Sequence, residues 1–328
     1  MKRSVVFASC LSVVISACSQ VSDVQILSPE EVLKNAAQVS MDLETVRYDL
    51  SGDVHIVDAN DVPTNGTMTM KGLIRDSGEQ LQFSVDFSAT TKYPEGDSSL
   101  SATVDVIIAG SEDLFVRLER YDLDGTNPFF NPELLDKFTG TWWKVPSRDN
   151  QVSSVSLTPN PRILHAQSQV ISVLKDKGLA TLQGRKMYHY DVRLDQDKMV
   201  TYLQQLAGEA QGEFDEAAVR ASLADLEAKG EIWIDAETFA VQKLHWDIRQ
   251  KLTNTNQQIQ TSFTVNFSDH NNAPAIVPPT DAKDFSPLMF FGVTDIPETQ
   301  SSPLTPEMQD DIIRQLLEEG ADSPYTTR

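Results

Sequence analysis

The sequence has few cysteines, few basic residues relative to acidic ones, and little continuous apolar sequence. Its 328 residues contain two cysteines, Cys10 and Cys18, so no disulfide stabilises the chain after residue 18. The apolar segment Val5–Ile15 is shorter than the roughly 20 residues that cross a bilayer. No later segment is long and apolar enough to do so.

Basic residues are outnumbered along the whole chain. There are 27 lysines and arginines against 48 aspartates and glutamates, and the formal net charge is −21. A surface of this charge repels nucleic acid and anionic headgroups, so neither is expected as a partner. We interpret the acidic residues as a solvated surface that keeps the folded chain soluble.

Motifs that carry catalysis are also missing. The sequence has no Gly-x-Ser-x-Gly, no His-Glu-x-x-His, no phosphate-binding glycine loop and no cysteine pair for zinc. Asp122–Asn127 is acidic but lacks EF-hand spacing, and we interpret it as a turn. We therefore predict no catalytic residue, no cofactor and no metal, and we expect a protein that is not an enzyme. The five histidines show no i, i+4 pair of the kind that holds a metal on a helix: His55, His165, His189, His245 and His270.

The N-terminus has the layout of an export signal. Lys2 and Arg3 precede the apolar segment, and small residues stand before Cys18. Ile15-Ser16-Ala17-Cys18 resembles the bacterial lipobox, which implies cleavage before Cys18 and acyl chains, palmitate among them, on that cysteine. The alternative is an ordinary signal with a chance cysteine at its end. We predict a signal peptide over 1–17 and a lipidated cysteine with its tether over 18–28.

This anchor defines an expected location. The protein would be held by its lipid on the extracytoplasmic side of a membrane in the cell envelope. The residue after Cys18 is Ser19 and not an aspartate. By resemblance to the lipoproteins of bacteria with two membranes, this favours the outer membrane if the cell has one.

A helix is predicted directly after the tether. Ser28-Pro29-Glu30-Glu31 forms a capping box with proline in the first turn. An apolar stripe at helical spacing follows: Val32, Ala36, Val39 and Leu43.

From Val46 onward the apolar period changes to two, which predicts strands with one buried face. In Trp142-Trp143-Lys144-Val145 the two tryptophans must point to opposite faces. Helices are predicted for Pro161–Lys177, Gln196–Leu206 and Glu213–Lys229, and three strands follow. The order predicts an α+β fold: one large, curled antiparallel sheet, an unclosed barrel, with helices packed across its concave face.

The composition changes near His270, where a segment rich in proline and polar residues begins. We predict one domain over 29–270, and a proline-rich linker with a C-terminal helical tail over 271–328. The apolar run Leu288–Phe291 and a short helix through Glu319 lie in this tail.

The element order resembles a known family. Tyr188-His189-Tyr190-Asp191-Val192, the helical insert after it, and Gly230–Asp235 followed by Val241–Leu244 look like the second half of LppX/LprG-type lipoproteins. Tyr48–Gly52 and Trp142–Val145 fit the first half. These proteins share the fold of the LolA and LolB lipoprotein carriers. The resemblance covers about Pro29 to Phe267 and implies an unclosed barrel with a helical lid that holds lipid or acyl chains.

The apolar face of the strands is the candidate site, because methionine and aromatic side chains adapt to hydrocarbon ligands. The alternative is that the same residues fill an ordinary core. We expect a carrier or sensor of a lipid, or a structural lipoprotein that docks another envelope protein through its tail. The candidate ligand face is Met68, Met70, Phe83, Val85, Phe87, Val104, Val106, Trp246 and Phe263.

Overall fold

The structure is a computed structural model that describes residues 27–94, 96–110, 113–125, 132–146, 169–209, 214–252 and 257–285. The chain divides into two compact units after Lys283, and the second lies almost wholly outside the described residues. Cys18, its tether up to residue 26, and the predicted tail from residue 286 on are likewise outside them.

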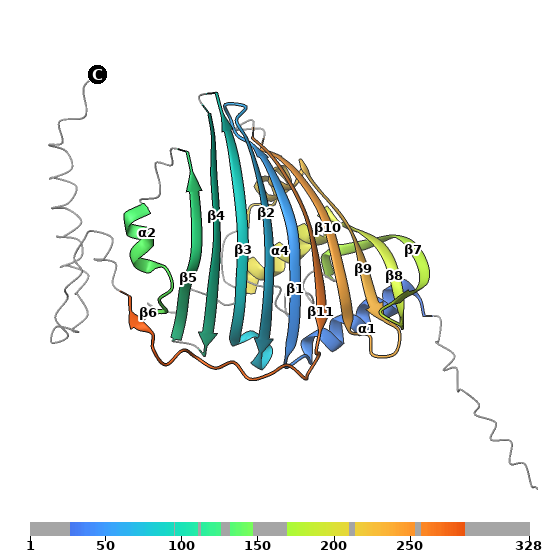
Figure 1. Ribbon diagram of the computed structural model, residues 1–328. Helices are drawn as coiled ribbons and strands as arrows, with labels where there is room; N and C mark the ends of the chain where they lie inside the picture. The colour runs from blue at the N-terminus through green and yellow to red at the C-terminus, as the bar shows by residue number, and fades with distance from the viewer. Residues whose placement is uncertain are drawn as a thin grey trace, which may run out of the picture. The chain divides into compact units, whose positions relative to one another are not determined.

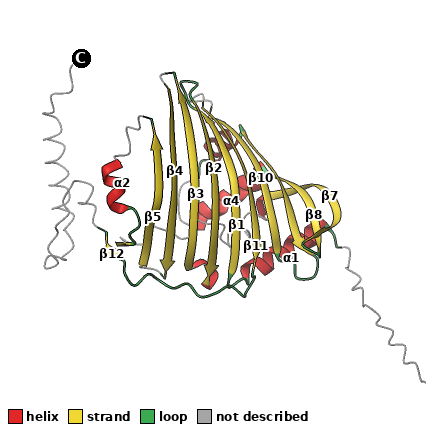
Figure 2. Cartoon of the chain, in the orientation of Figure 1, coloured by secondary structure: helices red, strands yellow, loops and turns green. Residues whose placement is uncertain are grey.

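Strands dominate the first unit (Figure 2). The strands are β1 (Val46–Val57), β2 (Pro63–Arg75), β3 (Gln80–Tyr93), β4 (Gly96–Ala109), β5 (Asp113–Asp124), β6 (Trp143–Pro146), β7 (Ile171–Leu182), β8 (Arg185–Leu194), β9 (Leu226–Asp235), β10 (Val241–Leu252), β11 (Gln257–Ser268) and β12 (Lys283–Asp284). The helices are α1 (Pro29–Met41), α2 (Pro132–Phe138), α4 (Gln196–Glu209) and α5 (Glu216–Leu223), with a short 3-10 turn, η1 (Asp76–Gly78).

All twelve strands belong to one sheet in the order β12-β6-β5-β4-β3-β2-β1-β11-β10-β9-β8-β7 (Figure 1). Two meanders, β1 to β6 and β7 to β11, join where β1 pairs with β11 antiparallel. The strands β12 and β7 end the sheet, so it does not close on itself. The predicted α+β fold class, with one large unclosed sheet, is confirmed.

The pleat separates an apolar from a polar face. Leu50 of β1 pairs with Val265 of the neighbouring strand β11 and with Met70 of the neighbouring strand β2. The row of side chains that crosses the sheet at these residues is apolar. The next row aligns Asp49 with Asn266 and is polar. Because side chains alternate along a strand, one face, here called the inner face, carries nearly all the long apolar residues.

Helix α1 covers part of the inner face. Its capping box is formed: the Glu31 backbone N–H donates to Ser28 Oγ, and the Ser28 backbone N–H donates to Glu31 Oε2 at 3.1 Å. Val32 and Ala36 on this helix are buried in the main apolar core with residues of β1, β8 and β10. The helix therefore holds its place by burying one apolar stripe against the sheet.

The outer face is polar except at Trp233 of β9, which stacks on the His189 ring, and at the β2 to β5 end of the sheet. There Leu73, Ile107 and Phe115 form a second small core with Ala273 and Ile276. The two tryptophans separate as predicted. Trp142 packs against this second core, whereas Trp143 pairs with Val116 of the inner face and contacts the Phe138 ring edge-on at 5.2 Å.

The segment after β11 crosses this outer core. The backbone N–H of Asn271 donates to the Thr45 carbonyl, and Arg75 Nη1 donates to the Ala273 carbonyl at 2.8 Å. The first part of the predicted linker, as far as Lys283, therefore packs within the first unit.

Two predicted helices are wrong over part of their length. Within Pro161–Lys177, the residues from Ile171 on form β7, which pairs with β8; residues 151–168 lie outside the described part. Within Glu213–Lys229, α5 ends at Leu223 and the residues from Leu226 on form β9. In both, long-range strand pairing overrides a local helical pattern.

Candidate functional site

All nine residues of the candidate ligand face lie on the inner face. One row crosses the sheet as Trp246, Phe263, Gly52, Met68 and Phe87. The neighbouring rows bring Met70 beside Val85, Val85 beside Val104, and Phe83 beside Val106. The strands β2, β3, β4, β10 and β11 thus bring the nine side chains to one surface.

Gly52 keeps that row close together. A side chain at Gly52 would meet the Ser262 carbonyl oxygen at 2.8 Å and Phe263 Cβ at 2.9 Å. Glycine therefore lets β1 pass between the large side chains of Phe263 and Met68.

Burial divides the nine residues into three groups. Met70, Phe83 and Trp246 are buried members of the main core. Met68, Val85, Val106 and Phe263 are partly buried and pack against it. Phe87 and Val104 are partly buried, yet they belong neither to the core nor to the apolar residues packed against it. The apolar face is therefore longer than the core that fills it.

Beneath α1 the sheet and the helix pack closely. A cavity of about 20 Å³ remains there, lined by residues of α1 and of β7 to β10, Trp246 among them. A cavity of this size holds about one water molecule and excludes an acyl chain.

A larger hollow lies on the other flank of α1, and we call it the α1–β7 groove. Its volume is about 540 Å³. It is bounded by one side of α1, the start of β7 and the first turn of α4. Its lining residues are Glu30, Leu33, Lys34, Ala37, Gln38, Met41, Gln169, Ile171, Ser172, Val173 and Lys198.

Hydrogen bonds fix the far wall of this groove. Ser172 Oγ donates to Asp195 Oδ2 at 2.7 Å, and Asp195 also accepts the backbone N–H of Lys198. The hydrogen bond from Ser172, followed by that backbone N–H, holds the pKa of Asp195 below its ordinary value. Lys198 Nζ donates to the Ile171 carbonyl at 2.8 Å, so its ammonium group is held beside Ile171 in the lining of the groove.

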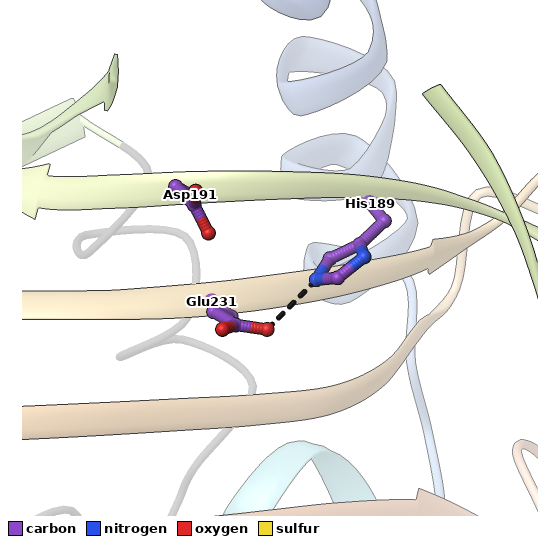
Figure 3. A group of neighbouring side chains, drawn as sticks. All are labelled: His189, Asp191 and Glu231. Atoms are coloured by element: carbon purple, nitrogen blue, oxygen red, sulfur yellow. Dashed lines mark hydrogen bonds and ion pairs between the residues drawn. The ribbon is translucent and has the colours of Figure 1, made fainter. Parts of the chain in front are cut away.

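A cluster of charged residues on the outer face was not predicted (Figure 3). His189 Nε2 lies 2.8 Å from Glu231 Oε2, and one donor atom each of His189, Asp191 and Glu231 lie within 4.8 Å of one another. Lys177 Nζ binds Asp191 at 2.6 Å and Glu231 at 3.1 Å.

The ammonium group of Lys177 offsets part of the negative charge of this cluster. Burial raises the pKa of Glu231, but hydrogen bonds from His189 and Lys177 outweigh burial and bring the pKa below its ordinary value. The hydrogen bonds to Asp191 and Glu231 in turn raise the pKa of Lys177. Although the donor set suits a divalent cation, a lysine already bridges both carboxylates, and we interpret the cluster as an ion-pair network that ties β7 to β8 and β9.

The sequence alone indicated only part of the charged cluster and none of the α1–β7 groove. His189 and Asp191 are two residues apart on β8 and therefore share a face, which was visible in advance. Glu231 and Lys177 join them only through strand pairing. The α1–β7 groove had no signal, because its three walls are far apart in the sequence.

The described part of the chain begins at Leu27. Its backbone N–H donates to the Tyr188 hydroxyl, while burial raises the pKa of Tyr188. Leu27 also packs against the main core. The predicted lipid on Cys18 lies outside the described residues and stays a prediction. Among the helices that the structure describes, none has the length and apolar character needed to cross a membrane.

Comparison with known proteins gives likeness in structure alone. No protein-family model matches the chain, and no curated protein matches it. The solved structure of lipoprotein LppX of Mycobacterium tuberculosis is similar, with 10% identity and a TM-score of 0.32 over 76% of this chain and 97% of that one.

LprF of Mycobacterium bovis is similar at 10% identity and a TM-score of 0.36, over 77% of this chain and 97% of that one. The resemblance to LppX/LprG-type proteins suggested by the sequence thus recurs in the structure comparison. A porin-like protein of Bacteroides uniformis also matches, at 9% identity and a TM-score of 0.15, over 70% of this chain and 96% of that one. At such values likeness carries no information on ligand or anchor, so function is argued from this chain's own geometry.

Proposed function

We propose that this chain is a lipid-anchored lipoprotein of the bacterial envelope that binds a lipid or another hydrophobic ligand between its sheet and its helices. It would act as a carrier or sensor and would not catalyse a reaction. The observation that supports this most is the apolar inner face that continues past the core at Phe87 and Val104.

The driving force is burial of apolar surface. Each 100 Å² of apolar area that a ligand removes from water contributes about 2.5 kcal/mol. Met68 and Phe263, which are partly buried at the edge of the core, offer flexible and aromatic surface to a hydrocarbon chain.

The anchor completes the proposal. A diacylated Cys18 would hold the chain on the extracytoplasmic side of its membrane, in the outer membrane if the cell has one. From Cys18 to Leu27 the chain has nine peptide steps, so an extended tether reaches about 30 Å. The groove beside α1 would then stay near the lipid surface from which a ligand is drawn.

One experiment tests ligand binding directly. The chain from Ser19 on is purified from bacterial cells, extracted with organic solvent and examined for co-purified lipid by mass spectrometry. Titration with a fluorescent fatty-acid probe follows on the delipidated protein. We expect saturable binding at one or two sites per chain, and absence of both lipid and saturable binding would end the proposal.

A second candidate function has an observation of its own in its favour. The helix α1 packs on the sheet with a cavity of only about 20 Å³, as expected for a filled core. A structural lipoprotein of this kind would dock another envelope protein, with the segment 271–328 as the expected contact. Removing residues 286–328 would abolish recovery of that partner from membranes while leaving probe binding unaffected.

A further inference from the structure

We infer that the α1–β7 groove binds a long-chain fatty acid, with its carboxylate at Lys34 and Lys198 and its chain along α1. This assignment rests on the proposed function and gives it a ligand class and a location. It follows from the shape, the charge and the neighbours of the groove.

The groove has an apolar strip long enough to guide a chain. Leu33, Ala37 and Met41 succeed one another at four-residue steps along α1, and Ile171 and Val173 face them from β7. Met41 is 42% exposed although it is a large apolar residue, so this strip lacks cover at its end. The volume of about 540 Å³ lies within the range of sites that enclose small ligands.

The groove and the small cavity under α1 have a common wall. Leu33, Ala37 and Ile171 line both, and Trp246 of the candidate ligand face lines the cavity. A small outward shift of α1 would therefore join the groove to the inner face. The carboxyl end of a ligand would stay at the groove while its tail reaches the residues predicted from the sequence.

Charge selects the headgroup. Two lysines and one glutamate line the groove, which gives it a local charge of +1 on a chain whose net charge is −21. Among the described residues no carboxylate lies within ion-pair distance of Lys34. Lys198 uses one of its three donors on the Ile171 carbonyl and keeps two for a ligand.

One neighbouring carboxylate offsets part of this charge, and another is paired elsewhere. Asp195 accepts hydrogen bonds from Ser172 and from the first turn of α4 and keeps its negative charge near Lys198, whereas Asp197 is paired with Arg220 at 2.8 Å. Glu30 also lines the groove and lowers the net charge of its lining residues to +1, which one monovalent anion balances. A carboxylate fits this balance, because it carries one negative charge and accepts from two ammonium groups.

The test compares two ligands that differ only in their headgroup. Palmitate and hexadecanol compete for the delipidated chain against a fluorescent fatty-acid probe, for the wild type and for Lys34→Gln and Lys198→Gln. We expect each substitution to weaken the binding of palmitate by about 2- to 5-fold, the range of an ion pair at a partly exposed site, and to leave the binding of hexadecanol unchanged. Lys92→Gln, at an exposed lysine near the end of β3, is the matched control and should change neither.

The outcomes separate this inference from the proposed function. Equal binding of palmitate and hexadecanol to every variant would overturn carboxylate recognition while leaving hydrophobic binding intact. Loss of both ligands in Lys198→Gln, but of neither in Lys34→Gln, would mean that Lys198 only holds β7 in place, and this would also overturn the assignment. Absence of binding by either ligand to the wild type would contradict the proposed function itself.

Discussion

Phe83 and Phe87 lie four residues apart on the same face of β3, and replacing each by alanine separates the core from the ligand face. Phe83 is 7% exposed and belongs to the main core. Phe87 is partly buried, stands beside Met68 and Ala102, and lies beyond the core. The two variants change the same side chain on the same strand and differ in what surrounds it.

The expected stability costs differ because only one site leaves an enclosed cavity. Phe83→Ala should lower the free energy of unfolding by about 3–5 kcal/mol, as for a buried phenylalanine. Phe87→Ala removes apolar surface that is only partly buried and leaves little enclosed cavity. The free energy of unfolding should therefore fall by about 1–2 kcal/mol. If a ligand chain covers about 40 Å² of the Phe87 ring, its removal weakens binding by about 1 kcal/mol, or about 5-fold.

Urea unfolding followed by tryptophan fluorescence gives the stabilities, and displacement of a fluorescent fatty-acid probe gives the affinities. Phe87→Ala should bind more weakly with a small change in stability. Phe83→Ala should be much less stable and should bind nearly normally under conditions in which it is folded. Equal losses of stability at the two sites, with unchanged binding in Phe87→Ala, would refute the view that the apolar face extends beyond the core.

Three further predictions concern stability. Gly72→Ala should lower the free energy of unfolding by about 1–3 kcal/mol, because a side chain at this position would collide with the Tyr48 ring. In a double-mutant cycle, an equal loss of stability from Gly72→Ala in the Tyr48→Leu background would contradict this cause. Ser28→Ala should cost about 0.5–2 kcal/mol in the same urea assay by removing the cap of α1, and a neutral result would mean that α1 needs no cap. Burial lowers the pKa of His270, although its ring N–H donates to the Val241 carbonyl at 3.0 Å. The unfolded chain then binds a proton near pH 6.5 before the folded chain does, so stability falls as pH drops below about 6.5. His270→Gln should flatten this fall between about pH 7 and pH 5, and an unchanged slope would assign the effect to other groups.

The sequence predicted the elements whose pattern is local. Helix α1 was placed because Ser28 and Glu31 form a cap that acts within four residues. The strands β3 and β4 were placed because apolar side chains stand at every second position, over Leu81–Phe87 in β3 and Val104–Ile108 in β4.

The misplaced elements depend on distant partners. Leu226–Gly230 resembles the end of a helix, but it forms part of β9: the whole segment pairs with β10, and from Lys229 on it also pairs with β8. Gly230 is needed there because a side chain would collide with the His245 carbonyl and meet the Trp246 ring at 3.0 Å. A glycine that stops a helix and a glycine that leaves room for a tryptophan on the next strand look the same in one sequence.

The candidate site, like the strands and helices, was predictable only where its pattern is local in the sequence. Period-two alternation placed the nine apolar residues on one face, since the pleat determines it. It gave no volume, because the space between sheet and helix depends on how α1 docks. The α1–β7 groove combines one helix flank with the starts of β7 and α4, and only tertiary packing makes Lys34 and Lys198 line the same groove.

Photolabelling locates the ligand most directly. A fatty acid with a diazirine near its methyl end is bound to the delipidated chain, irradiated and mapped by peptide mass spectrometry, with excess palmitate as competitor. Competed labels are expected on α1, on β7 and on the inner face around Trp246, Met68 and Phe87. Labels confined to outer-face residues such as Ser84 and Thr264, or labels that palmitate does not remove, would contradict a hydrophobic ligand held between the sheet and its helices.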